Sequence, residues 1–158
     1  MSEEKVLKQA QAVYRALCKM LDEREWRYEK KENELSIRCG AQGEDLPMEI
    51  IIEVDVDRQL ATLLSPMPFT VPENRRVALA VAVSQANNGM VDGCFDYDCQ
   101  TGKIIFRMTS SFRQSLIGKD LFAYMLNCSC YTVDEYNDKF LVVAKNDMSI
   151  DQIVEYIK

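Results

Sequence analysis

The sequence predicts an α+β domain in which helices pack on one face of a largely antiparallel sheet. Three observations predict it: apolar residues recur at helical spacing before residue 22, they alternate with polar residues through two later segments, and helical spacing returns after each segment. The predicted strands are separated by only a few residues, which favours antiparallel pairs because a parallel pair needs a long crossover. The expected order is α-β-β-β-β-α-β-β-α-α.

The first half of the chain is expected to form one helix and four strands. Ser2 is a suitable helix cap, and Glu3 and Glu4 favour the first turn because carboxylates complement the positive end of a helix. Period-two patterning starts at Trp26 and indicates strands. Their expected bounds are residues 26–29, 35–39, 48–54 and 60–64. The side chains expected to face the core are Trp26, Tyr28, Leu35, Ile37, Cys39, Met48, Ile50, Ile52, Val54, Leu60, Thr62 and Leu64.

The second half is expected to form a helix, two strands and further helices. Thr70 and Glu73 make a capping-box pattern, and so do Ser149 and Gln152, so a helix is predicted after each pair. A helix is expected over 71–87, followed by strands at 91–97 and 104–108 and a polar loop at 109–115. Helical spacing returns over 119–146, which fits one helix or two helices with a break near Cys130. A short helix is expected from 149. No linker or internal repeat divides the chain, so one domain over residues 1–158 is expected.

Composition and charge exclude several classes of partner. The chain has 158 residues and a net charge of −6. An acidic surface repels phosphate groups, which disfavours nucleic acid and anionic membranes. The N-terminal segment lacks the apolar stretch of a signal peptide, and no apolar run approaches the ~20 residues that a membrane span needs. We therefore expect a cytoplasmic protein that contacts neither nucleic acid nor membrane.

The absence of histidine removes the commonest general base and the commonest metal ligand. The spacing of the six cysteines does not match paired zinc ligands, and a cytoplasm keeps thiols reduced. We therefore expect six free thiols with no disulfide, no metal and no cofactor. The cysteines are Cys18, Cys39, Cys94, Cys99, Cys128 and Cys130.

Carboxylates near Cys94 leave one enzymatic alternative open. Asp92, Asp96 and Asp98 are expected on the same strand face as Cys94. The pattern fails as a calcium loop, because Thr101 stands where glycine is required. A solvated strand face explains these residues without chemistry. The alternative is a thiol- or carboxylate-dependent enzyme using Cys94, Asp92 and Asp96; otherwise no residue is predicted to be catalytic.

The outward sides of the predicted strands are mostly charged, with three apolar exceptions. The alternation puts Ile51, Leu63 and Ile105 on that side. If neighbouring strands bring them together, they form an exposed apolar patch, and such patches often mark interfaces. Scattered single apolar residues are the other interpretation, because most surfaces carry some. Ile51, Leu63 and Ile105 are therefore the candidate partner-binding residues.

Three segments in the second half of the chain resemble the YbjN family of bacterial proteins. They are residues 69–76 (FTVPENRR), residues 87–98 (NNGMVDGCFDYD) and residues 102–107 (GKIIFR). The resemblance implies a fold like that of type III secretion chaperones, and it transfers no catalytic residue. The family is linked to sensory-transduction regulation. The resemblance favours a non-enzymatic module, chaperone-like or regulatory, that binds a protein or peptide partner and can form a homodimer.

Overall fold

A six-stranded antiparallel sheet, in the order β1-β2-β3-β4-β6-β5, forms the middle of the molecule. The computed structural model describes residues 2–158. The strands are β1 (Tyr28–Lys31), β2 (Ser36–Gln42), β3 (Pro47–Asp55), β4 (Leu60–Pro66), β5 (Cys94–Asp98) and β6 (Lys103–Ser111). The helices are α1 (Glu3–Glu23), α2 (Arg76–Asn87), α3 (Lys119–Lys145) and α4 (Ile150–Ile157), with short 3-10 turns η1 (Glu32–Glu34) and η2 (Glu73–Arg75). The predicted α+β class and element order are confirmed.

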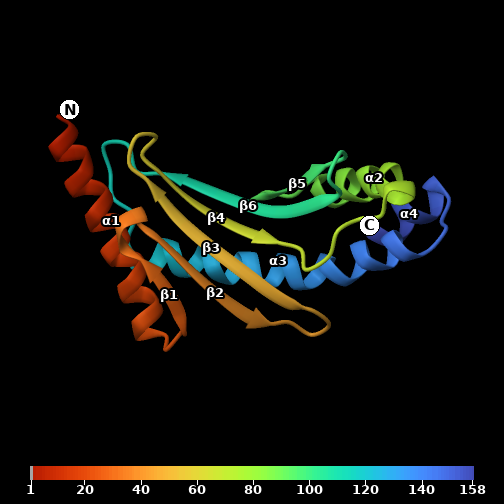
Figure 1. The fold of residues 1–158 in the computed structure, drawn as a ribbon, viewed down its shortest axis with the longest axis horizontal. Helices are drawn as coiled ribbons and strands as arrows, with labels where there is room; N and C mark the ends of the chain where they lie inside the picture. The colour runs from red at the N-terminus through yellow and green to blue at the C-terminus, as the bar shows by residue number, and fades with distance from the viewer. Residues whose placement is uncertain (1) are drawn as a thin grey trace.

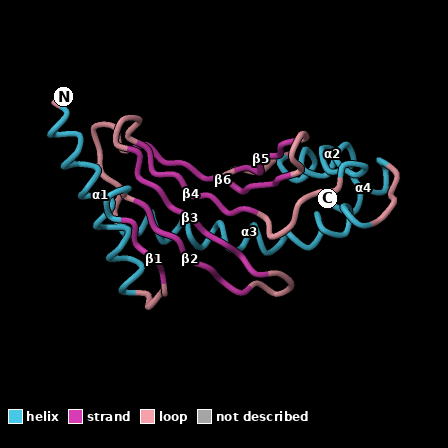
Figure 2. Tube along the Cα trace, in the orientation of Figure 1, coloured by secondary structure: helices cyan, strands magenta, loops and turns pink. Residues whose placement is uncertain are grey.

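The helices are gathered on one side of the sheet and at its ends. Figure 1 shows the long helix α3 running behind the central strands, with α1 at one end of the molecule and α2 and α4 at the other. The same layers are visible in Figure 2, where no helix crosses in front of β3 and β4. The sheet therefore has a covered face, packed against helices, and an open face.

Aromatic rings close the core where α3 meets β5 and β6. The Phe95 ring lies edge-on to Phe106, Phe140 and Tyr136, with centroid separations of 5.1, 5.0 and 5.7 Å. Edge-to-face pairs add stabilisation of roughly 0.5–1.5 kcal/mol beyond the area that they bury. This cluster fixes α3 to the covered face, because Phe140 belongs to α3 while Phe95 and Phe106 belong to neighbouring strands.

Helix α1 starts and docks as its sequence predicts. The Ser2 side chain accepts a hydrogen bond from the Lys5 backbone N–H at 3.3 Å, which satisfies one of the free amides of the first turn. The Tyr14 hydroxyl donates to the Ser36 carbonyl at 2.9 Å and ties the helix to β2. The buried residues of α1 are Ala10, Val13, Tyr14, Leu17, Cys18, Met20 and Leu21.

The start of α2 differs from the prediction. The capping box at Thr70 and the helix from Val71 are wrong, since α2 begins at Arg76 after the 3-10 turn η2. The reason is a tertiary contact: the Val71 N–H donates to the Gly102 carbonyl at 2.9 Å, which holds the chain against the β5–β6 turn. A Cβ on Gly102, whose φ is +75°, would clash with the Val71 carbonyl oxygen, so glycine is needed there.

Two further boundaries are settled by the structure. Helix α3 is one unbroken helix of 27 residues, so the alternative with a break near Cys130 does not hold. Strand β6 continues to Ser111, opposite Leu60, and the first part of the predicted polar loop 109–115 is therefore strand. The capping box at Ser149 is confirmed, because the Ser149 and Gln152 side chains each accept from the other's backbone N–H.

Both edges of the sheet are protected against further strand pairing. At the β5 edge, the Asn87 side chain donates to the Phe95 carbonyl at 3.0 Å and accepts from the Phe95 N–H at 2.8 Å, so one amide replaces a neighbouring strand. At the other edge, β1 has only four residues, and three of them are charged. Short, charged edge strands resist pairing with another chain. The end of β2 beyond β1 adds only three unpaired residues, Gly40 to Gln42.

Candidate functional site on the open face of the sheet

Four apolar side chains lie together on the open face, and we call them the apolar strip: Ile51, Leu64, Pro66 and Ile105. Register brings them together, because Ile51 lies opposite Leu64 and Pro66 lies opposite Ile105. Directly opposite residues in an antiparallel pair point to the same face. All four are half-buried by their neighbours, with no helix above them.

The prediction that Leu63 lies on the outward face is wrong. Leu63 is fully buried and lies opposite Ile52, which is also fully buried, so both point into the core. The cause is the turn between β3 and β4, which pairs Val54 with Ala61 and so sets the inward positions of β4 at Ala61, Leu63 and Ser65. The same register corrects the inward assignment of Leu60, Thr62 and Leu64, which lie on the open face and are half-buried.

Ile51 and Ile105 do lie on the open face, and Leu64 is the neighbour that sequence reasoning missed. The residues 60–64 are apolar at both even and odd positions, so alternation alone does not assign their faces. The signal that could have assigned these faces is the number of residues between Val54 and Ala61 in the turn. That number decides which residues of β3 and β4 lie opposite each other.

Two arginine–carboxylate pairs flank the apolar strip. On one side, the Arg38 guanidinium is 3.2 Å from Glu49. On the other, Arg107 makes a two-pronged contact with Asp96, with Nε 2.7 Å from Oδ2 and Nη2 3.1 Å from Oδ1. This contact holds the pKa of Asp96 below its ordinary value and raises the pKa of Arg107. The strip is therefore an apolar band between two mixed-charge borders.

The expected cluster of carboxylates around Cys94 is only partly formed. Cys94 lies opposite Arg107, and its sulfur is 3.4 Å from Arg107 Nη2 and 3.8 Å from Asp96 Oδ1. Asp92 precedes the strand and accepts a hydrogen bond from the Tyr124 hydroxyl on α3, so it does not join Cys94. The Asp98 carboxylate accepts from the Gln100 N–H and stabilises the β5–β6 turn.

The cysteines do not form a common site. All six are free thiols in the structure, and within residues 2–158 no group of three histidine, cysteine or acidic residues is placed to hold a metal ion. Burial raises the pKa of Cys39 to about 12, and burial also raises the pKa values of Cys18, Cys128 and Cys130. A thiol with a raised pKa is a poor nucleophile near neutral pH.

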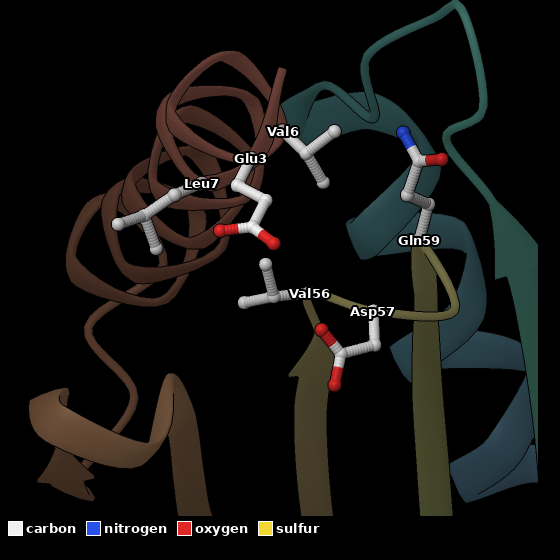
Figure 3. Close-up of a pocket in the computed structure, with 6 residues that line it drawn as sticks. All are labelled: Glu3, Val6, Leu7, Val56, Asp57 and Gln59. Atoms are coloured by element: carbon white, nitrogen blue, oxygen red, sulfur yellow. The ribbon is translucent and has the colours of Figure 1, made fainter. Parts of the chain in front are cut away.

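A separate cleft of about 490 Å³ lies between the first turns of α1 and the turn after β3 (Figure 3). Figure 3 shows Glu3 on the helix and Asp57 on the facing turn, with Val56 between them. The amide of Gln59 already donates to Gln9 at 3.0 Å. The lining residues are Glu3, Val6, Leu7, Val56, Asp57 and Gln59. The carboxylates of Glu3 and Asp57 are the ionisable groups among these six, none of which carries a hydroxyl, a thiol or a cationic group.

Comparison with solved structures identifies the fold. No family model and no curated protein matches the sequence. Among solved structures, a crystal structure of YbjN from E. coli, described as "a putative transcription regulator", matches with a TM-score of 0.58 and 14% sequence identity over 79% of this chain and 91% of that chain. The chain has the YbjN fold. The resemblance expected from the sequence is thus confirmed for the fold, while the role of the open face rests on its own residues.

No helix in residues 2–158 combines the length and the apolar character that a bilayer span requires. The register of this chain's own strands places a charged pair on each border of the apolar strip.

Proposed function

We propose that this protein is a non-enzymatic protein-binding module, chaperone-like or regulatory, and that its partner docks on the apolar strip of the open face. The observation that carries the proposal is the position of the strip: three aliphatic side chains and a proline lie at the centre of an uncovered sheet, between two arginine–carboxylate pairs. Apolar centres with polar borders are the usual anatomy of protein–protein interfaces.

The protected sheet edges support docking on the face rather than by strand addition. Asn87 occupies the hydrogen-bonding groups of Phe95 at one edge, and β1 is short and charged at the other. A partner polypeptide gains little by adding a strand where these groups are already satisfied or charged. The uncovered face is the larger surface that remains.

A regulatory role fits the description of YbjN as a transcription regulator, and the charge of this chain favours protein as the partner. The net charge of −6 repels nucleic acid and anionic membranes. Regulation would then act through contacts with another polypeptide. Six free thiols fit the reducing cytoplasm, which we propose as the location.

The enzymatic alternative gains no support from the geometry around Cys94. Asp96 is bound to Arg107, which lowers the pKa of its carboxyl and makes it a weak base. Asp92 is engaged with Tyr124. Asp96 contacts the Cys94 thiol only as a carboxylate already held by Arg107, and Asp92 is held by Tyr124, so we assign this cluster to the border of the binding surface.

The test is affinity capture with charged variants of the strip. Ile51→Glu and Ile105→Glu place a carboxylate that loses its hydration when the face is covered, so each should abolish capture of the partner from the native cytoplasm. Mass spectrometry of the captured proteins is the readout, and thermal unfolding establishes that each variant is folded.

Val77→Glu is the matched control, because Val77 is 81% exposed on α2 and lies away from the strip. It adds the same charge and should leave capture unchanged. If both strip variants fold and capture the same proteins as the parent does, the open face is not the binding surface and the proposal fails.

A further inference from the structure

The outward side of α3 carries a row of apolar residues that is open to solvent. Helix α3 packs against the covered face of the sheet, so its free side lies on the opposite side of the molecule from the apolar strip (Figure 1). Tyr124 and Tyr131 are 51% and 73% exposed there, which leaves two large rings in contact with water. Residues three or four apart lie along one line of a helix. We call the residues on this line the α3 row: Leu121, Tyr124, Cys128 and Tyr131.

Beyond Tyr131 the same side of α3 becomes acidic. A cleft of about 300 Å³ opens there, next to the loop that joins β2 to β3. The Asp134 carboxylate accepts a hydrogen bond from the Glu44 N–H at 2.8 Å, which holds this loop against the helix. Five carboxylates line this acidic cleft beside Tyr131, and among residues 2–158 none of them forms an ion pair with a lysine or arginine. They are Glu44, Asp45, Asp134, Glu135 and Asp138.

We propose that this side of α3 binds an amphipathic helix of a partner protein, one half of which is apolar and the other half rich in lysine or arginine. The apolar half packs on the α3 row, and the basic half enters the acidic cleft. Packed helices interdigitate ridges of side chains three and four residues apart, so a helical partner fits the row better than an extended one. This docking surface is separate from the apolar strip and does not depend on it.

Charge decides which occupant fits this surface. Five neighbouring carboxylates attract cations, and the attraction grows where apolar contacts exclude water. A second copy of this chain carries the same acidic cleft and the same net charge of −6, which oppose its approach. Nucleic acid and anionic membranes are repelled for the same reason. A basic chain without apolar residues leaves the two exposed tyrosine rings in water, so only an amphipathic partner matches both halves.

The length of the surface sets the length of the partner helix. At about 1.5 Å per residue, the line from Leu121 to Asp138 is roughly 26 Å long, so a partner helix of about 18 residues covers it. One helix laid along another in this way buries less than about 1,200 Å² in total, the size of a weak, transient interface. Screening by salt should therefore weaken the complex visibly, because much of the attraction is between charges near the surface.

The test is fluorescence anisotropy with labelled synthetic peptides of about 18 residues, which carry leucines at heptad a and d positions in one half and lysines in the other half. The peptide is made with its two halves in either order. The parent protein should bind one order in about 50 mM salt and lose at least about tenfold in affinity in about 0.5 M salt, where the Debye length is less than about 5 Å. Replacing the lysines by glutamates, or the leucines by serines, should each weaken binding at least about tenfold.

Variants of the protein locate the site. Glu135→Lys/Asp138→Lys should weaken binding of the lysine peptide at least about 30-fold, because it turns attraction into repulsion. Tyr131→Ser should weaken it at least about fivefold, because it removes the most exposed ring of the row. Glu29→Lys/Glu53→Lys is the matched control, since it makes the same change of net charge at exposed positions of the open face. It should stay within about threefold of the parent, because charges more than a Debye length away are screened.

Four results would overturn the inference. They are no binding of either peptide order by the parent at about 1 mM protein, equal binding of the glutamate peptide, binding by Glu135→Lys/Asp138→Lys that equals that of the parent, and an equal loss in the control. If that charge-reversed variant does not fold, Glu135→Gln/Asp138→Asn replaces it, and parental binding by this folded variant also overturns the inference. Ile51→Glu should bind the peptide as the parent does, so failure of the open face and failure of this surface are distinguishable.

Discussion

The covered and open faces of the sheet carry similar residues but differ in what lies above them. Ile52 and Leu63 are fully buried beneath the helices, while the adjacent Ile51 and Leu64 are half-buried and face outward. Ile51 and Ile52 are identical residues one position apart. Side-chain type therefore does not decide which residue supports the fold and which is available to a partner; the register of the strands does.

The difference also appears in the polar groups. Ser65 on the covered side donates its hydroxyl to the Glu49 carbonyl at 2.6 Å, so its burial is compensated. The open face instead carries charged pairs that remain about half exposed, Arg38 with Glu49 and Arg107 with Asp96. Such pairs add little to stability but define which surfaces match them. The covered face is stabilised by buried, satisfied groups, and we propose that the open face serves recognition.

The largest expected effect comes from placing one carboxylate on each face. Leu63→Glu buries an unpaired charge and should lower the free energy of unfolding by more than about 4 kcal/mol, or prevent folding altogether. Leu64→Glu, next to it on the open face, should cost about 1 kcal/mol or less. Chemical denaturation compares the two. Equal losses would mean that the two faces do not differ in the way described.

A smaller effect is expected where the sheet edge is closed. Asn87→Ala removes both hydrogen bonds to the Phe95 backbone and leaves its N–H and carbonyl without partners, so the free energy of unfolding should fall by about 1–3 kcal/mol. Asn88→Ala is the control, because Asn88 is exposed, and it should change stability by less than about 0.5 kcal/mol. If Asn87→Ala and Asn88→Ala have the same free energy of unfolding, the hydrogen bonds that close the β5 edge do not stabilise the fold.

The smallest effect concerns the border of the strip and depends on pH. The hydrogen bonds from Arg107 lower the pKa of Asp96 in the folded protein. A lowered carboxyl pKa contributes stability above the unfolded value of about 3.9, and that stability is lost as pH falls through the folded pKa. Because the pair is about half exposed, the contribution at pH 7 should be no more than about 1 kcal/mol.

Asp96→Asn tests this sign directly. At pH 7 the variant should be slightly less stable than the parent, and the difference should shrink towards zero once the pH is below the folded pKa of Asp96. Urea denaturation of both proteins across this pH range is the measurement. A difference that stays constant with pH would show that Arg107 does not hold the carboxylate as described.

The sequence predicted the elements better than it predicted their contacts. The cap at Ser2, the change to period two near Trp26 and the capping box at Ser149 depend on residues close together in the chain, and all three correspond to observed boundaries. The start of α2 did not follow its local pattern, because a hydrogen bond between Val71 and Gly102 overrides the capping signal. That bond joins segments that are distant in sequence.

The candidate site shows the same limit. Ile51 and Ile105 were assigned to the correct face because a single apolar residue interrupts a run of outward charged residues in each strand. The sequence could not decide which of Leu63 and Leu64 faces outward, since apolar residues occupy both even and odd positions in 60–64 and so fit either register. The pairing of Arg107 with Asp96 depends on the β5–β6 register, which alternation within one strand does not contain. The partner-binding role of Ile51 and Ile105 stays a prediction.

Leu64→Glu provides the most direct test of the central claim, that the covered face maintains the fold while the open face binds a partner. The measurement is the melting temperature of the variant together with its capture of partner protein from the native cytoplasm, each against the parent. A loss of about 1 kcal/mol should lower the melting temperature by only about 2–4 °C in a chain of this size. We expect that small shift together with loss of partner capture. A variant that melts like the parent and captures the same proteins would contradict the claim, as would one that does not fold.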